Sequence, residues 1–269
     1  ELPHLVRARD RQGRYILDFG ARAPQESFWG RGSPAARRSF LEALTAVWQG
    51  LAESDRFNQL VGVVGLTWRQ VVCLRVVATY LKQTTHYSRR YLQSALTENP
   101  GMAALLVELF EARFDPTRFV DQPEQRAAAE AELADRLLEQ LAQVPSLDHD
   151  RIIRCYLSVI QAAVRTNFYQ LRGVADAGPI ALKLDPRRIP HLPAPRPAFE
   201  VWVYSPSVEG VHLRFGKVAR GGLRWSDREE DFRTEVLGLV KAQMVKNAVI
   251  VPTGAKGGFY PKRLPDPAG

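Results

Sequence analysis

Residues 216–258, GKVARGGLRWSDREEDFRTEVLGLVKAQMVKNAVIVPTGAKGG, alternate glycine-rich segments with apolar ones. Ser226 lies three residues before Glu229, the spacing of a capping box, which predicts that a helix begins there. This helix has an apolar face made by Val236, Leu237, Leu239, Val240 and Met244. The apolar run 248–252 then predicts a strand, and Lys256 follows it in a loop of glycines. We therefore expect an α/β unit bounded by two glycine loops.

This arrangement has a chemical consequence if the second glycine loop folds back beside the first. It would bring four polar side chains to one edge of a sheet: Arg220, Gln243, Lys246 and Lys256. Gln243 and Lys246 are three residues apart, so they share one face of the helix near its carboxyl end. Gathered cations are tolerated when an anion binds among them. The sequence thus predicts a site for a dicarboxylate.

The segments immediately upstream also suit a sheet. FEVWVYS (199–205) and VHLRF (211–215) predict two short strands separated by a turn. They follow the proline-rich stretch 184–197, which predicts an extended connector. We place a domain boundary close to residue 175, so that residues 176–269 form the α/β part.

Residues 33–175 predict an all-helical module without an internal repeat. Pro34 after Ser33 marks the first helix, and Thr67 with Gln70 forms a capping box for the helix at 65–83. Further helices are predicted at 99–115, 123–144 and 146–170. The first helix carries a one-sided apolar stripe made by Phe40, Leu41, Leu44, Val47, Trp48 and Leu51. We expect a structural role for this module, with oligomer contacts or regulation left open.

Residues 1–32 predict the end of an upstream module, with a short strand in 13–22. The chain begins with Glu1 and stops in what the sequence predicts to be a loop, so we expect it to be a piece of a longer protein.

Composition sets wider limits. The chain has 269 residues, a net charge of +8 and two cysteines, Cys73 and Cys155, each in a helical apolar pattern. No run approaches the roughly 18 consecutive apolar residues of a membrane span, and no segment resembles a signal peptide. We expect a cytoplasmic protein with free thiols. The positive charge permits an anionic partner without choosing one.

Several kinds of site are disfavoured by the sequence. The five histidines show no metal-ligand spacing with one another or with the cysteines, so no metal site is expected. GAKGG is not a phosphate-binding P-loop, because Gly257 stands where that motif needs serine or threonine. No G-x-G-x-x-G follows a predicted strand, so no residue is assigned to a nucleotide cofactor.

Three blocks of this region are similar to the substrate-binding segment of the glutamate dehydrogenases. They are ARGGLRWSD (219–227), KAQMVKNAVIVP (241–252) and GAKGG (254–258). Upstream, FNQLVGVVGLTWRQVVCLRVVATYLKQ (57–83) and LFEARFDP (109–116) resemble the large bacterial NAD-specific class. The resemblance runs from about residue 33 onward. It implies that 176–269 is the start of an amino-acid dehydrogenase substrate-binding domain, truncated before the nucleotide-binding domain.

The resemblance also implies roles for individual residues. Lys256 matches the family's catalytic lysine, and Gln243 and Lys246 match the pair that holds the α-carboxylate of glutamate. Arg220 stands before Gly221 and Gly222 where the family has a lysine that contacts the side-chain carboxylate, so the charge is kept and the reach differs. Ala255 stands where the family commonly has a third glycine.

The activity implied is NAD-dependent oxidation of L-glutamate to 2-oxoglutarate and ammonia by a homo-oligomer. NAD would bind to a domain beyond this chain, and neither nucleic acid nor a membrane would be a partner. Two alternatives stay open at this point. A branched-chain or aromatic amino-acid dehydrogenase shares the domain but places an apolar residue where Arg220 stands. A basic helical scaffold or nucleic-acid-binding module is the alternative outside enzymes.

Overall fold

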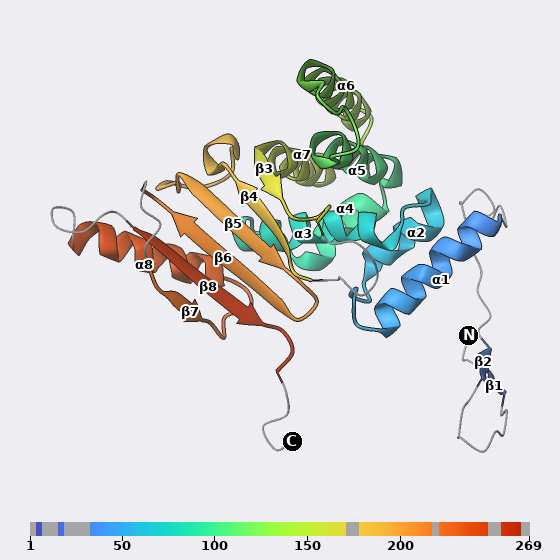
Figure 1. Cartoon of the computed structure of the whole chain (residues 1–269), viewed down its shortest axis with the longest axis horizontal. Coiled ribbons are helices and arrows are strands. Elements are labelled where there is room, and N and C mark those ends of the chain that lie inside the picture. Colours follow the sequence, from blue (N-terminus) through green and yellow to red (C-terminus); the bar gives the residue numbers. More distant parts are fainter. Residues whose placement is uncertain are drawn as a thin grey trace.

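The computed structural model describes most of the chain: residues 4–6, 16–18, 33–170, 178–216, 221–246 and 254–264. Arg220 and the predicted strand at 248–252 lie outside the described residues. A group of helices packs against a six-stranded sheet, and one further helix lies along that sheet (Figure 1). This agrees with the prediction of a helical part followed by an α/β part.

The helices are α1 (Pro34–Trp48), α2 (Gln59–Val64), α3 (Trp68–Thr84), α4 (Arg89–Thr97), α5 (Pro100–Phe114), α6 (Pro123–Leu141), α7 (Leu147–Ala162) and α8 (Phe232–Lys246). Two of their predicted starts are confirmed. The Ser33 side chain accepts a hydrogen bond from Ala36 N, and Thr67 and Gln70 form the reciprocal capping box of α3. Both caps satisfy backbone N–H groups that have no partner within the helix.

Helix α1 does not bury the apolar stripe that its sequence shows. Its buried residues are Ala36, Ala43 and Ala46, whereas Leu41 is 59% and Trp48 is 81% exposed. The small alanine face lets α1 approach its neighbours closely; of the stripe, Val47 and Leu51 are half-buried against the core, whereas Phe40, Leu41, Leu44 and Trp48 are exposed.

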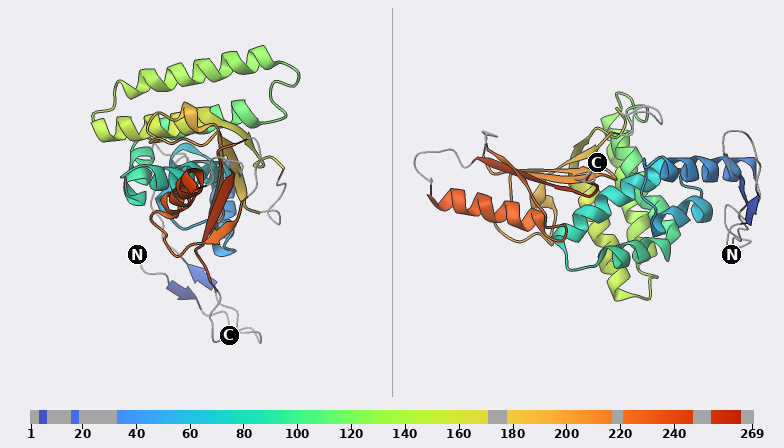
Figure 2. Two further views of the ribbon diagram at one scale, coloured as in Figure 1. Left: turned by 90° about the vertical axis from the view of Figure 1, so that its left-hand side faces the viewer. Right: turned by 90° about the horizontal axis from the view of Figure 1, so that it is seen from below.

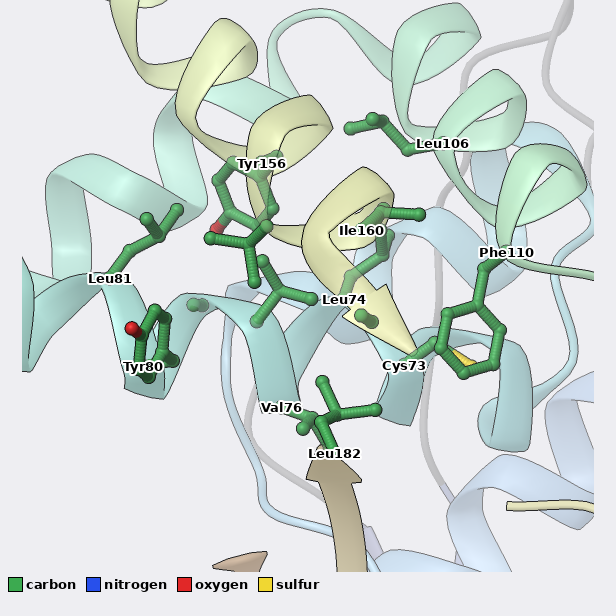
Figure 3. Packing of buried hydrophobic residues seen from close by; sticks show 14 of the residues in the cluster. Cys73, Leu74, Val76, Tyr80, Leu81, Leu106, Phe110, Tyr156, Ile160 and Leu182 are labelled. Atoms are coloured by element: carbon green, nitrogen blue, oxygen red, sulfur yellow. The ribbon is translucent and has the colours of Figure 1, made fainter. Parts of the chain in front are cut away.

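Helix α3 lies at the centre of the hydrophobic core. All but four of its seventeen residues are buried, as the apolar character around its circumference predicts. Figure 3 shows Cys73 near Phe110 of α5 and Val76 near Leu182 of strand β4. The helices and the sheet therefore share one continuous core.

The sheet has the strand order β3 (Ala163–Thr166), β4 (Ile180–Leu184), β5 (Phe199–Tyr204), β6 (Val208–Arg214), β8 (Ala255–Pro261) and β7 (Leu223–Trp225). All neighbouring pairs are antiparallel except β7 and β8, which are parallel. Strands β5 and β6 confirm the predicted pair. A separate antiparallel pair joins β1 (His4–Val6) to β2 (Ile16–Asp18), inside the predicted 13–22 segment.

The predicted helix at 146–170 is too long. Helix α7 ends at Ala162, and the chain passes directly into β3, which pairs with β4. Arg113 of α5 donates two hydrogen bonds to the carbonyl oxygen of Ala163, at 3.1 and 3.0 Å. These tertiary contacts override the helical pattern of the sequence.

The predicted helix start at Ser226 is also wrong, because α8 begins at Phe232. The Ser226 hydroxyl donates to Glu235 Oε2 at 2.7 Å and accepts from Arg228 N at 3.2 Å. Ser226 thereby stabilises a loop over 226–231, and no capping box forms with Glu229.

Helices α3 and α8 lie on the same side of the sheet, as the view from below shows (Figure 2). Side chains alternate between the two faces of a strand, and Trp202 and Val211 face these helices. Gly258 pairs with Val211 and lies on that face. A Cβ atom on Gly258 would come within 2.4 Å of Val236 Cγ2, so this glycine allows α8 to pack directly on β8.

We predict that Gly258→Ala lowers the free energy of unfolding by about 1–3 kcal/mol, because the added methyl group overpacks the contact between α8 and β8. Val236→Ala in the same chain should recover part of the loss, since it removes the methyl groups that Gly258→Ala meets. Urea unfolding of the four chains measures this coupling. Losses that simply add would contradict the proposed contact.

A second prediction concerns His191, which is half-buried with Nε2 3.3 Å from Thr84 Oγ1. Burial, together with the guanidinium groups of Arg233 and Arg196, lowers the pKa of His191 to about 4. The unfolded chain therefore binds this proton at a higher pH than the folded chain does. Stability contributed by neutral His191 is lost as the pH falls from about 6.5 to about 4.

We expect His191→Asn to lose less stability than the wild type over this pH range, because the variant has no imidazole to protonate. Urea unfolding at several pH values between about 7 and 4 measures the difference. Parallel stability curves for the two chains would contradict the assignment.

Candidate substrate site

Lys256 does not lie in a glycine loop, and this part of the sequence-based prediction is wrong. It is the second residue of β8 and pairs with Leu213 of β6. Of the three glycines around it, Gly254 has a positive φ of 70°, whereas Gly257 and Gly258 are in the strand. The two strand glycines are explained by close neighbours: a Cβ atom on Gly257 would come within 2.5 Å of Leu223 Cδ2.

The first glycine pair lies directly beside β8. The amide of Gly257 donates to the carbonyl oxygen of Gly222 at 3.2 Å, just ahead of the parallel ladder between β7 and β8. A Cβ atom on Gly221 would stand 1.5 Å from the carbonyl oxygen of Ala255. This distance is a steric clash, so no residue with a side chain fits there without a shift of the backbone. A Cβ atom on Gly222 would meet nothing within 4 Å. Gly221 and Gly222 are thus neighbours of the segment 254–258, although more than thirty residues of the chain separate them.

Gln243 lies on the side of α8 that faces the sheet. Val236 and Val240 are fully buried on the same stripe, four and then three residues apart. Gln243 is half-buried, and its Oε1 atom is buried without a hydrogen-bond partner among the described residues. A buried amide oxygen without a donor is costly, so a donor from a ligand would be favourable there. Lys246 ends α8, and its side chain lies outside what the structure describes.

Gln243 and Lys256 are brought together by the connection β7–α8–β8. Lys256 is two residues before Gly258 and therefore shares its sheet face, the face that α8 covers. Moving along α8 from Val236 to Gln243 leads toward the end at which the chain returns to β8. Moving along β8 from Gly258 to Lys256 leads in the same direction. Gln243 and the half-buried Lys256 are thus on the facing sides of helix and sheet, toward the end where Gly222 bonds to Gly257.

Neighbouring side chains at the other end of α8 are structural. Arg224 of β7 pairs with Glu235, in the first turn of α8, at 2.7 Å. Trp225 is 59% exposed and packs its ring 6.0 Å from that of Phe259. It makes no contact with Lys256 that would suggest a catalytic role.

One buried ion pair was not predicted from the sequence. Arg233 of α8 and Glu200 of β5 pair at 2.6 Å, with side chains 4% and 0% exposed. A sign of it is present in FEVWVY, because Glu200 shares the alternating inward positions with Trp202 and Tyr204.

Neither a metal-binding cluster nor a membrane-spanning helix is present among the described residues. No group of three or more histidine, cysteine, aspartate or glutamate side chains there could hold a metal ion. No helix in the same part of the chain is both long enough and apolar enough to cross a membrane.

Comparison with known proteins matches two family descriptions. Residues 52–116 match "Glutamate dehydrogenase, helical motif 3", and residues 136–269 match "Bacterial NAD-glutamate dehydrogenase, catalytic domain". Together they include α3, the sheet, α8 and Lys256. The chain thus has a sheet joined to helices, and the part that contains the sheet matches the catalytic domain of a class of dehydrogenases.

Three relatives named NAD-specific glutamate dehydrogenase are similar over most of the chain. Those of Mycobacterium tuberculosis, Pseudomonas aeruginosa and Halomonas elongata are 55%, 53% and 51% identical over 87%, 83% and 86% of this chain. The chain spans 14% of the length of each of these relatives. It belongs to the bacterial NAD-glutamate dehydrogenase family.

The glycine pair before β7 supports a stability prediction with a matched control. Gly221→Ala should lower the free energy of unfolding by about 1–3 kcal/mol or more, because its methyl group would displace the backbone of β8 at Ala255. Gly222→Ala should have a much smaller effect, since its methyl group would enter open space. Urea unfolding compares the two chains. Equal losses would show that the segment does not lie against Ala255.

Proposed function

We propose that this chain is part of a longer NAD-dependent glutamate dehydrogenase, which oxidises L-glutamate to 2-oxoglutarate and ammonia. The observation that carries the proposal is the convergence of Gln243, Lys256 and the Gly221–Gly222 backbone at one end of the β7–α8–β8 unit. The identity of 51–55% to relatives named for this activity supports the same reaction.

The proposed site suits a ligand with two carboxylates. The Nε2 group of Gln243 would donate to the α-carboxylate, together with Lys246, which follows it by about one turn of α8. The unpartnered Oε1 atom of Gln243 would accept from the amino group of the substrate. Arg220 immediately precedes the glycine pair that lies against β8, and we propose that it binds the side-chain carboxylate. A guanidinium group favours an acidic side chain over an apolar one, because it binds carboxylates in a forked geometry.

Lys256 is the proposed catalytic residue. Its place on an inner strand, half-buried under α8, would fix its amine beside the α-carbon of a substrate held by Gln243. There the amine would hold the water that attacks the imine and then hydrogen-bond the carbonyl oxygen that forms. Hydrolysis of the imine gives 2-oxoglutarate and ammonia.

The described residues do not fit a dinucleotide. The connection from β7 to α8 is SDREED (226–231), which places four carboxylates where a pyrophosphate would need glycines and free amides. The Arg233 amide in the first turn of α8 already donates to Gln83 Oε1 at 3.1 Å. In the proposed enzyme, NAD binds to another part of the longer protein and accepts the hydride from the α-carbon.

The proposal includes an organisation for the chain and its surroundings. Residues 1–32 would end an upstream module, 33–175 would form the helical module, and 176–269 would begin the substrate-binding domain of the dehydrogenase fold. The enzyme would act as a homo-oligomer in the cytoplasm on small molecules, without nucleic acid or a membrane as partner.

The decisive substitution is Lys256→Ala in the full-length enzyme. We predict a loss of turnover of about 10²–10⁴-fold, the range for removing a proton-transfer group, while glutamate still binds. Steady-state rates with glutamate and calorimetric titration measure the two properties separately. Lys241→Ala is the matched control, because Lys241 is an exposed lysine of α8.

Normal turnover by Lys256→Ala would remove Lys256 from the mechanism. Faster oxidation of leucine than of glutamate by the wild-type enzyme would instead contradict the proposed substrate.

A further inference from the structure

The ion pair between Arg233 and Glu200 lies where the helical part, the sheet and α8 meet. Arg233 donates from Nε to Glu200 Oε1 at 2.6 Å and from a terminal nitrogen to Oε2 at 2.7 Å. Tyr80 of α3 donates its hydroxyl to Glu200 Oε2 at 3.3 Å. Burial alone would lower the pKa of Arg233, but the Glu200 carboxylate raises it above its ordinary value. The Arg233 guanidinium group therefore keeps its charge in the core.

Gln83, near the carboxyl end of α3, ties the same region through its side-chain amide. Its Nε2 atom donates to the carbonyl oxygen of Glu229 at 2.7 Å, and its Oε1 atom accepts from Arg233 N at 3.1 Å. The first N–H groups of a helix have no partner within it, so Gln83 supplies α8 with a cap from another part of the fold. We refer to Arg233, Glu200, Tyr80 and Gln83 as the Arg233 cluster.

Aromatic packing reinforces the start of α8. Phe232 stacks on Trp202 of β5, with ring centroids 5.5 Å apart, and Tyr80 meets the same indole edge-on at 5.6 Å. The indole nitrogen of Trp202 donates to Thr79 Oγ1 of α3 at 3.2 Å. The amino-terminal turn of α8 is thus fixed by both α3 and β5.

The Arg233 cluster connects to the candidate site by two routes. Gln243 is ten residues beyond Arg233 on the same helix, about 15 Å at the usual rise of an α-helix. Glu200 pairs with Leu213, which pairs with Lys256, so the carboxylate and the lysine are in one row across three strands. A shift at the cluster would move Gln243 relative to Lys256.

We propose that the residues of the Arg233 cluster are positioning residues, through which the helical module sets Gln243 opposite Lys256. This gives the helical module a defined part in substrate binding. The expected effect on glutamate binding rests on the proposed function, whereas the expected effect on the position of α8 does not.

Gln83→Met in the full-length enzyme is the most suitable variant. Substituting Arg233 or Glu200 would leave an unpaired charge in the core and could prevent folding. Methionine keeps the approximate volume of Gln83 and removes its two hydrogen bonds, one with Arg233 of α8 and one with Glu229 in the loop just before it.

Gln70→Met is the matched control. Gln70 is on the same helix, and its amide is also hydrogen-bonded: its Oε1 atom accepts from Thr67 N at 2.8 Å and Thr67 Oγ1 at 3.1 Å, and its Nε2 atom donates to Glu111 Oε1 at 2.7 Å. Both of its partners belong to the helical part, so this substitution does not touch α8.

The first readout is hydrogen exchange of peptides from 232–246. We expect Gln83→Met to accelerate this exchange about tenfold relative to the wild type, and Gln70→Met to leave it unchanged. The second readout is kinetic. Gln83→Met should lower kcat/KM for glutamate about tenfold, chiefly through a higher KM, because the groups that hold the substrate are misplaced.

Three results would overturn the proposal: unchanged exchange in 232–246, equal effects of the two variants, or faster exchange with unchanged KM. A wild-type enzyme that does not oxidise glutamate would refute the proposed function. The exchange measurement would still decide whether the cluster fixes α8.

Discussion

A carboxylate in a protein core must be hydrogen-bonded, and Glu200 accepts three hydrogen bonds from two partners. Its oxygens accept two hydrogen bonds from Arg233 and one from Tyr80, in a place that solvent does not reach. Removing one member of such a buried pair typically costs about 3–5 kcal/mol, because the remaining charge is left unpaired. This constraint forces α3, β5 and α8 to meet at one point. The path of α8 beyond this meeting point then determines which residues of α8 and β8 face each other.

From the Arg233 cluster, α8 runs along the sheet close to β8. Gly258 makes the approach possible, since even a methyl group there would collide with Val236. Gly221 has the corresponding role at the other side of β8, where its backbone passes the Ala255 carbonyl group. The glycines of this family segment thus bring backbone and helix together around Lys256. Close approach of neighbouring atoms explains Gly257 and Gly258. Of the three glycines near Lys256, Gly254 alone has the positive φ of a turn.

Much of the architecture was predictable from local signals. Ser33 and Thr67 mark helix starts by side chains that satisfy backbone N–H groups, and the alternation in 199–204 marks β5. The failures occur where distant residues decide. Ser226 has the spacing of a helix cap but bonds to Glu235, and the cap of α8 comes from Gln83 on another helix. GAKGG has the composition of a loop but becomes an inner strand, because its neighbours occupy the space of the missing side chains.

The candidate site was predictable in composition and only partly in geometry. The sequence pattern predicts Gln243 near the carboxyl end of a helix and Lys256 among glycines. In the structure, the helix and the strand that carry these residues pack against each other. No local pattern could show that the Gln243 side chain has a buried amide oxygen without a partner, since that depends on the path of α8. Arg220 lies outside the described residues, so its contribution stays a prediction.

The most direct measurement is an experimental structure of the full-length enzyme with 2-oxoglutarate bound. The account predicts one carboxylate of the ligand within about 3 Å of the Gln243 side-chain amide, with the Lys256 amine within hydrogen-bond distance of the keto oxygen. A ligand bound elsewhere, with Gln243 and Lys256 still contacting only protein, would contradict it.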